Sequence, residues 1–215
     1  MNIFWYGFSC IRIETKTAQG DASLVTDPFD AKAGGLKLPR ALKTDIGLLS
    51  APVSKETREI FAPAEEGKDV FFIDSAGEFE KSGIFVSGFR AGDDPRTIYM
   101  IEAEDIHILY CGALSKPLSD ADLEKIENID ILIVPVGGHG VMSGKEAADF
   151  ANALEPRIVI PVQYHLPGVK EDLDGAEAFI KAMGGKAEEP VAKLKINRKD
   201  LPEDTTKIVL LSPAV

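Results

Sequence analysis

The fold class is decided by the stretch Asp130-Ile131-Leu132-Ile133-Val134-Pro135-Val136-Gly137-Gly138-His139. Its apolar core, Ile131–Val136, lies between two segments with helical spacing, Leu118–Ile126 and Lys145–Leu154, and a second apolar run follows at Ile158–Val162. Strands that alternate with helices form parallel sheets, and they read as continuous apolar runs because both of their faces are covered. We therefore predict strand–helix–strand units in the second half of the chain.

The first half of the chain is rich in short β-type segments separated by Gly, Asp and Pro, which predicts strands and turns. These segments are Ile3–Tyr6, Cys10–Glu14, Ser23–Thr26, Ile46–Leu49, Val70–Ile73, Ile84–Phe89, Thr97–Ile101 and Ile106–Tyr110. A third helix is expected over Leu173–Met183, before Gly184-Gly185, and a last strand over Lys207–Leu211. The whole pattern predicts an α/β protein in which two packed sheets carry helices on the outside, in one domain spanning residues 1–215.

The composition excludes some classes of function. The 215 residues include 24 Lys and Arg against 35 Asp and Glu, a net charge of −11, which argues against a nucleic-acid partner. No apolar stretch approaches the roughly 18 residues of a membrane span, so no membrane partner is expected. Met1–Ile13 lacks the charged start and the cleavage site of a signal peptide, and Cys10 and Cys111 lack metal-site spacing. We expect a cytoplasmic protein with two buried thiols.

Three histidines set the limits of any imidazole chemistry. His107 alternates with apolar residues inside a predicted strand and is interpreted as structural. His139 follows a strand and a glycine turn, and His165 follows the strand Ile158–Val162 closely. Proteins of the α/β class bind ligands at the ends of their strands, so His139 and His165 are candidates for a cleft.

Two acidic positions are further candidates. Asp27 ends a predicted strand before Pro28, where it either lines a cleft or caps its own turn. Glu78 and Glu80 lie on one face of an extended segment, as a carboxylate pair or as solvated side chains. No GxGxxG, Walker or GxSxG motif is present, so nucleotide-binding and serine-hydrolase functions lack a motif.

Several of these stretches correspond to motifs of one known family. They are Trp5-Tyr6-Gly7-Phe8-Ser9-Cys10, Thr26-Asp27-Pro28-Phe29, Ala76-Gly77-Glu78-Phe79-Glu80, Asp130–Gly138 with His139, Met142 and Glu146-Ala147, and Pro156–Tyr164. Together they resemble the metallo-β-lactamase superfamily, in the branch of small bacterial and archaeal hydrolases related to ascorbate-6-phosphate lactonase. The resemblance covers about residues 2–164 and implies a four-layer αββα sandwich with a cleft at one edge of the two sheets.

The family's metal-binding motifs are not kept. Its HxHxDH motif, which supplies ligands to zinc, manganese or iron ions, corresponds to Ala51, Val53, Lys55 and Glu56 here. The aspartate of its GD motif corresponds to Ala113, the last histidine to Gln163, and the histidine of the opening turn to Phe8. The loop Arg90–Pro95 lacks a further family histidine. Only Glu56 and Asp93 among the replacements could bind a cation. The ammonium group of Lys55 would repel a dication at this site unless the side chain points to solvent. We therefore expect no zinc or manganese cofactor.

The leading hypothesis is a metal-free pseudo-hydrolase that binds a small molecule or protein. The resemblance implies that its cleft is lined by Asp27, Glu78, His139, Gln163 and His165. One alternative is a rebuilt enzyme for lactone or phosphoester substrates, with His139 or His165 as a base and Lys55 or Cys10 as its partner. Another is a displaced manganese or magnesium site made from Glu56, Asp93, His139 or His165. A structural role in a homo-oligomer also stays open.

Overall fold

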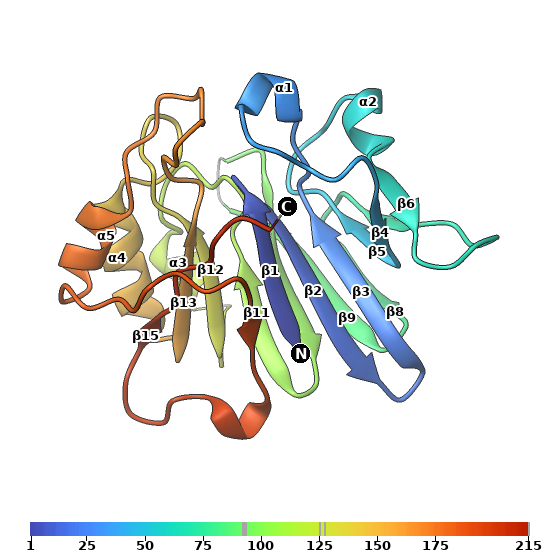
Figure 1. Ribbon diagram of the computed structural model, residues 1–215. Coiled ribbons are helices and arrows are strands. Elements are labelled where there is room, and N and C mark those ends of the chain that lie inside the picture. The colour runs from blue at the N-terminus through green and yellow to red at the C-terminus, as the bar shows by residue number, and fades with distance from the viewer. Residues whose placement is uncertain (92–93, 125, 127, 215) are drawn as a thin grey trace.

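The computed structural model describes residues 1–91, 94–124, 126 and 128–214, and most of its strands belong to two sheets. The six-stranded sheet has the order β14 (Leu194–Lys195), β1 (Asn2–Gly7), β2 (Cys10–Thr17), β3 (Gly20–Thr26), β5 (Ile46–Leu48) and β7 (Phe71–Ile73). The seven-stranded sheet has the order β15 (Lys207–Ile208), β13 (Ile158–Val162), β12 (Ile131–Pro135), β11 (Ile106–Tyr110), β10 (Thr97–Ala103), β9 (Ile84–Arg90) and β8 (Gly77–Lys81). In Figure 1, β1, β2 and β3 of the first sheet lie in front of β9 and β11 of the second.

The main hydrophobic core draws on both sheets. In β1 the burial alternates along the strand, and Ile3 and Trp5 have no exposed surface, as expected of a strand that turns one face to the core. Every residue of β12 and of β13 is buried, because helices cover their second face. The sandwich predicted from the sequence is confirmed.

Helices cover the outer side of the seven-stranded sheet. They are α3 (Asp120–Leu123), α4 (Gly144–Leu154) and α5 (Glu177–Ala182), and Figure 1 shows α4 and α5 packed together on that side. The helix α4 begins at Ser143, whose side chain accepts a hydrogen bond from Glu146 N–H while the Glu146 side chain accepts one from Ser143 N–H. Strands β11, β12 and β13 are parallel, so the predicted strand–helix–strand units are confirmed.

The outer side of the six-stranded sheet is covered by short segments. A parallel pair, β4 (Leu42–Thr44) and β6 (Phe61–Pro63), lies there with two four-residue helices, α1 (Ala31–Gly34) and α2 (Lys55–Arg58). A second apolar cluster joins these segments to the sheet, made of Cys10, Val25, Leu42, Leu49 and Phe61. Helix α1 stops at Gly35, which has a φ of 81° that favours glycine.

Two predicted helices are shorter than expected. The helix predicted over Leu173–Met183 begins at Glu177, because Asp174 instead exchanges backbone hydrogen bonds with Gly137 and His165. The predicted helix Leu118–Ile126 is described only as α3, entered through Ser119, whose hydroxyl accepts a hydrogen bond from Asp122 N–H. The last predicted strand shortens to β15, and a 3-10 turn, Arg198–Asp200, precedes it.

Two further expectations concern the cysteines and membrane-spanning segments. Cys10 and Cys111 are both buried and unpaired, as predicted. Within the described part of the chain, no helix is long and apolar enough to cross a membrane.

Candidate functional site

Four strands of the two sheets end at one edge of the sandwich, and two of the predicted site residues, Asp27 and Gln163, follow such strand ends. Asp27 follows β3, Ser50 lies two residues beyond β5, Gly112 follows β11 by two residues and Gln163 follows β13 directly. Because β3 is parallel to β5, and β11 is linked through β12 to β13 in parallel, the carboxyl ends of these strands meet there. This edge is where α/β proteins place ligand groups.

The Asp27 carboxylate is held from both sheets. Ser50 N–H donates a hydrogen bond of 2.7 Å to Oδ1, and the Ser50 hydroxyl lies 2.6 Å from Oδ2. The Tyr110 hydroxyl, which comes from β11 in the other sheet, lies 2.6 Å from the same Oδ2 and 2.7 Å from the Ser9 carbonyl oxygen. The backbone of Asp27 is in the left-handed region with a φ of 30°, a strained conformation for a residue other than glycine.

The surroundings of Asp27 change its acidity. Burial raises the pKa of the Asp27 carboxyl above its ordinary value, against the opposing effects of the hydrogen bonds from Ser50 and Tyr110 and of the Arg96 charge. Burial and the neighbouring Asp27 charge also raise the pKa of Tyr110. The site therefore favours neutral groups.

An ion pair lies beside this cluster. Arg96 Nη1 is 3.1 Å from both oxygens of Asp94, and the Ser115 hydroxyl donates a hydrogen bond of 2.6 Å to Asp94 Oδ2. Burial raises the pKa of Asp94, but these hydrogen bonds and the Arg96 charge outweigh burial and leave the pKa below its ordinary value. Asp94 is therefore a carboxylate, and the protein's own Arg96 and Ser115 donate hydrogen bonds to it.

Gln163 takes part in the same network as Asp27. The Ser9 hydroxyl donates a hydrogen bond of 2.8 Å to Gln163 Oε1, and the Ser9 carbonyl oxygen is the one that Tyr110 approaches. Gln163 N–H donates to the Phe8 carbonyl oxygen, which also accepts a hydrogen bond from Trp5 Nε1. The turn between β1 and β2 is thus fixed to the end of β13.

Sequence reasoning missed Ser9, Ser50 and Tyr110 as members of this network. Ser9 stood within a family-like motif, but the motif did not indicate its partner 154 residues away. Ser50 and Tyr110 each end or follow an apolar segment. The pairing of β3 with β5 brings Ser50 to Asp27, and the packing of the two sheets brings Tyr110 there.

Phe8, whose carbonyl oxygen accepts the Gln163 N–H hydrogen bond, belongs to an aromatic pair. The Phe8 ring packs edge-on against Phe29, with 4.9 Å between the ring centroids. Gly34 of α1 lies so close that a Cβ there would be 2.6 Å from Phe8. Phe8 is 6% exposed, so an apolar ring occupies the position that corresponds to the histidine of the family's opening turn.

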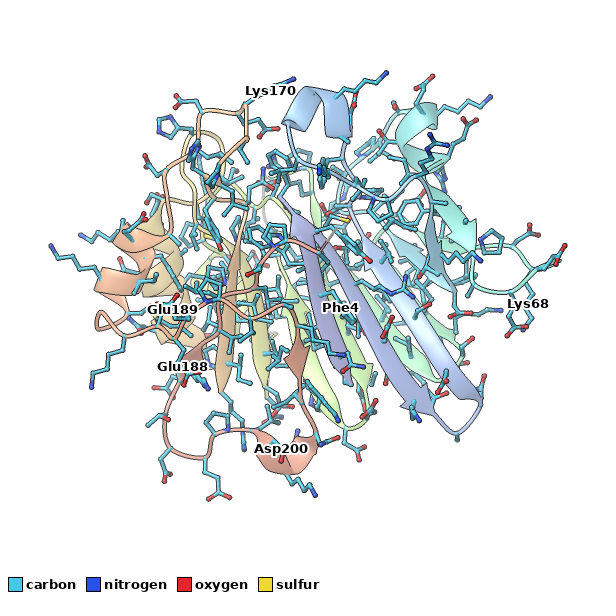
Figure 2. The ribbon with its side chains drawn as sticks, viewed as in Figure 1. Phe4, Lys68, Lys170, Glu188, Glu189 and Asp200 are labelled. Carbon is cyan, nitrogen blue, oxygen red and sulfur yellow. The ribbon has the colours of Figure 1, made fainter. Side chains whose placement is uncertain are left out.

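A loop after β13 contacts α1 and the glycine that ends it. Lys170 N–H donates to the Gly34 carbonyl oxygen, and Lys170 Nζ lies 2.5 Å from the Lys32 carbonyl oxygen. Figure 2 shows Lys170 beside the short helix that Figure 1 labels α1. A Cβ at Gly35 would meet the Gly168 carbonyl oxygen, which confirms how close the two segments are.

The positions that correspond to the family's HxHxDH motif lie at the start of α2. The Lys55 side chain is 85% exposed and pairs with Glu59 at 3.6 Å, so it points to solvent and would not repel a cation at the edge of the sheets. Glu56 is exposed, and hydrogen bonds from its own backbone N–H and from Ser54 lower its pKa. Val53 packs against the second apolar cluster. Lys55 and Glu56 are thus exposed, whereas Val53 packs on apolar side chains.

His139 and His165 belong to a neighbouring loop pair. His139 Nδ1 is 3.2 Å from Asp172 Oδ2 and its Nε2 is 3.6 Å from Asp174 Oδ1, with nearly half of the side chain exposed. His165 is exposed, and its N–H donates to the Asp174 carbonyl oxygen. The structure therefore brings His139 and His165 to the same loops. Among the described residues, the hydrogen-bond partners of the Asp27 carboxyl are Ser50 and Tyr110, and neither imidazole is one of them.

Glu78 stands apart from the other predicted residues. It is exposed on β8, the outermost strand of the seven-stranded sheet, and pairs with Ser87 of β9. Asp93 lies outside the described residues. Across the part of the chain that is described, no group of three or more His, Cys, Asp or Glu side chains is arranged to hold a metal ion.

Three surface cavities lie away from this edge. One of about 610 Å³ lies over the start of β1 and the middle of β2, with Arg12, Glu14 and Glu104 among its lining residues. Two others, of about 530 and 320 Å³, are lined by residues near Arg157 and near Phe71. The five predicted site residues line none of these three cavities.

Comparison with known proteins identifies the family. A family model described as a beta-lactamase superfamily domain matches residues 2–163. The chain belongs to the beta-lactamase superfamily. This membership confirms the resemblance found in the sequence.

Relatives within the superfamily carry the name of metal-dependent hydrolases. A UPF0173 metal-dependent hydrolase of Thermococcus onnurineus is 36% identical over 98 residues, 44% of this chain and 42% of that protein. Another, of Pyrococcus horikoshii, is 30% identical over 143 residues, 60% of this chain and 62% of that protein. The matches thus span less than two thirds of the length of these curated relatives.

A solved structure supports the superfamily fold over nearly the whole chain. It comes from Thermotoga maritima, and its name assigns it to the Zn-dependent hydrolases of the metallo-β-lactamase superfamily. The TM-score is 0.80 with 24% sequence identity, and the match covers 98% of this chain and 99% of that one. At this identity the match shows the fold alone.

Proposed function

We propose that residues 1–215 act as a single metal-free pseudo-hydrolase domain, which keeps the scaffold of its superfamily and serves as a binding or interaction protein. The observation that carries this proposal is the use of Phe8, Gln163 and Val53 in packing and internal hydrogen bonds. Each of them occupies a position that corresponds to a histidine of the superfamily's motifs.

The donor set does not fit a transition metal. Zinc is bound by thiolate, imidazole or carboxylate groups. The side chains of Ala51, Val53 and Ala113 have no atom that can bind a metal. The amide oxygen of Gln163 already accepts the Ser9 hydroxyl hydrogen bond. We therefore derive no reaction step through a metal, although the relatives are named metal-dependent hydrolases.

The electrostatics of the edge support the same proposal. Asp94 is neutralised by Arg96, and the remaining carboxyl, Asp27, has a pKa raised by burial. A dication is favoured by nearby uncompensated carboxylates, and its own charge would have to overcome the guanidinium of Arg96. Cys10 and Cys111, both unpaired, support a reducing compartment such as the cytoplasm.

The test is the metal content of untagged protein purified without chelator. The protein is dialysed after separate exposure to Zn²⁺ and Mn²⁺, and bound metal is measured by plasma mass spectrometry. We expect less than about a tenth of an equivalent of either metal, because a disturbed shell of second neighbours alone costs about 10- to 100-fold in affinity and here the ligand positions themselves are changed.

Retention of about one equivalent that is lost in E56Q or H139A would overturn the proposal. The matched control is E66Q, which removes another exposed carboxylate and should leave the metal content unchanged.

A second candidate function rests on His139. An imidazole with a carboxylate at 3.2 Å is the arrangement of an oriented general base, so a rebuilt hydrolase for lactone or phosphoester substrates would use His139 and Asp172. A panel of such substrates is assayed with the native chain, H139A, D172N and H165A. Turnover that falls at least 100-fold in H139A, with H165A unaffected, would favour this function, whereas equal rates in all four proteins would exclude it.

A further inference from the structure

Four oxygen atoms at the strand-end edge form a chain of short contacts. They are the Ser9 carbonyl oxygen, the Tyr110 hydroxyl, Asp27 Oδ2 and the Ser50 hydroxyl, and the successive distances are 2.7, 2.6 and 2.6 Å. Oxygen atoms at these distances need a proton between each pair, because two bare acceptors would repel each other. Three contacts therefore require three protons.

The neighbouring hydroxyls supply only two of these protons. Tyr110 and Ser50 each carry one, and a carbonyl oxygen carries none. The Thr26 hydroxyl also neighbours Tyr110, but its single proton is used in its own hydrogen bond of 2.7 Å to the Ser9 carbonyl oxygen, so Thr26 adds no proton to the three contacts. With Asp27 as a carboxylate, one of the three contacts would have no proton.

We infer that Asp27 is a neutral carboxylic acid at pH 7 and donates its proton to Tyr110, which in turn donates to the Ser9 carbonyl oxygen. Each contact then has one proton, and Ser50 N–H still donates to Oδ1. The acid joins the end of β3 in one sheet to β11 in the other and, through Ser9, to Gln163 at the end of β13. The hydrogen bonds that link the two sheets through Asp27 therefore depend on pH.

The other groups around Asp27 are consistent with a neutral acid. The cation that acts on it is Arg96, whose Nη1 is already bound to both oxygens of Asp94. The titratable neighbours Cys10 on β2, Tyr99 on β10 and Tyr110 on β11 all have pKa values raised by burial, so they are neutral at pH 7. Burial raises the pKa of Asp27 in the same way.

The inference fixes the sign of a pH dependence. The folded chain holds the Asp27 proton more tightly than the unfolded chain, whose aspartates titrate near about 4. The stabilisation is therefore fully present below the pKa of the unfolded state. It is lost as pH rises from the unfolded-state pKa to the folded-state pKa. In this window the unfolding constant of the native chain rises about tenfold per pH unit relative to a variant without the acid.

Asp27→Asn is the variant that tests this. The amide NH₂ can donate to Tyr110 as the acid does, and the amide oxygen can still accept Ser50 N–H. We expect D27N to fold, and its unfolding constant in urea should become smaller relative to the native one as pH rises from 5 to 7. A D27N chain that loses stability relative to the native chain over the same range would show a carboxylate and overturn the inference.

A direct measurement does not depend on the variant folding well. The ¹³Cγ resonance of Asp27 in the labelled native chain is followed from pH 4 to 9. A carboxylic acid shift at pH 7 is the expected result, and a carboxylate shift at pH 7 would overturn the inference. Asp94, which the structure holds as a carboxylate, is the internal control in the same spectra.

Discussion

The Ser9 hydroxyl donates a hydrogen bond of 2.8 Å to Oε1 of Gln163, between residues 154 positions apart in the chain. Both residues are buried, so the bond forms where water does not compete for it. The superfamily's motifs place a histidine where Gln163 stands, and the amide at this position instead fixes the β1–β2 turn to the end of β13. A position associated with metal binding in the family has a structural partner here.

A double-mutant cycle measures this bond. We expect S9A and Q163L each to lower the free energy of unfolding, and their coupling to be about 1 kcal/mol, the usual value for a neutral hydrogen bond. Urea denaturation gives the four free energies. S9A combined with F85A, which changes an exposed ring on β9, should be additive; coupling of the first pair near zero would show that Ser9 and Gln163 do not bond in solution.

Phe8 should contribute strongly to stability. Removing its buried ring in F8A costs about 3 kcal/mol or more, since large-to-small changes of buried aromatics cost about 3–5 kcal/mol. F85A removes a ring of the same size that is 54% exposed, and should cost far less. Thermal and urea unfolding of the two variants are compared. Equal losses in F8A and F85A would contradict the packing of Phe8 against Phe29.

Asp94 should stabilise the chain with the opposite pH dependence to Asp27. Its folded-state pKa lies below the ordinary value, so its contribution is present above the unfolded pKa and is lost as pH falls through the folded pKa. The difference in unfolding free energy between the native chain and D94N should be about 1.5–3 kcal/mol at pH 7, as for a hydrogen bond to a charged group, and should shrink toward pH 3. A difference that stays constant with pH would be inconsistent with the ion pair to Arg96.

Chelation should leave the fold unchanged. A bound structural metal adds its binding free energy to stability, so its removal lowers the melting temperature. We expect the melting temperature with EDTA to agree within about 1 °C with that in buffer and in added Zn²⁺, because about 1 kcal/mol shifts the melting temperature of a domain of this size by about 2–4 °C. A rise of several degrees with stoichiometric Zn²⁺ would count against a metal-free protein.

The capping box of α4 offers a local test. S143A removes the hydroxyl that accepts from Glu146 N–H and should cost about 1 kcal/mol. Hydrogen exchange should accelerate in the first turn of α4 before it does so in β12. S119A, at the start of the four-residue α3, is the matched control and should have the smaller effect, since a shorter helix carries less of the packing.

The sequence by itself determined the fold class and the positions of most strands. Its signals were local: alternation along β1, the apolar runs of β12 and β13 and the Ser143 start of α4 each follow from neighbouring residues. The same signals could not give the true start of α5, because the hydrogen bonds from Asp174 to Gly137 and His165 compete there with the helix.

The motifs also indicate Asp27, Gln163, His139, His165 and Glu78 as site residues, and the tertiary structure separates them. Asp27 and Gln163 share one buried network, the two histidines lie on a neighbouring loop pair, and Glu78 is exposed on an edge strand. Only the structure decided that Lys55 points to solvent, that Phe8 packs on Phe29 and that Tyr110 reaches Asp27. Spacing along a chain fixes which side chains share a strand or helix face, whereas contacts between sheets depend on how distant segments pack, and no local pattern records that packing.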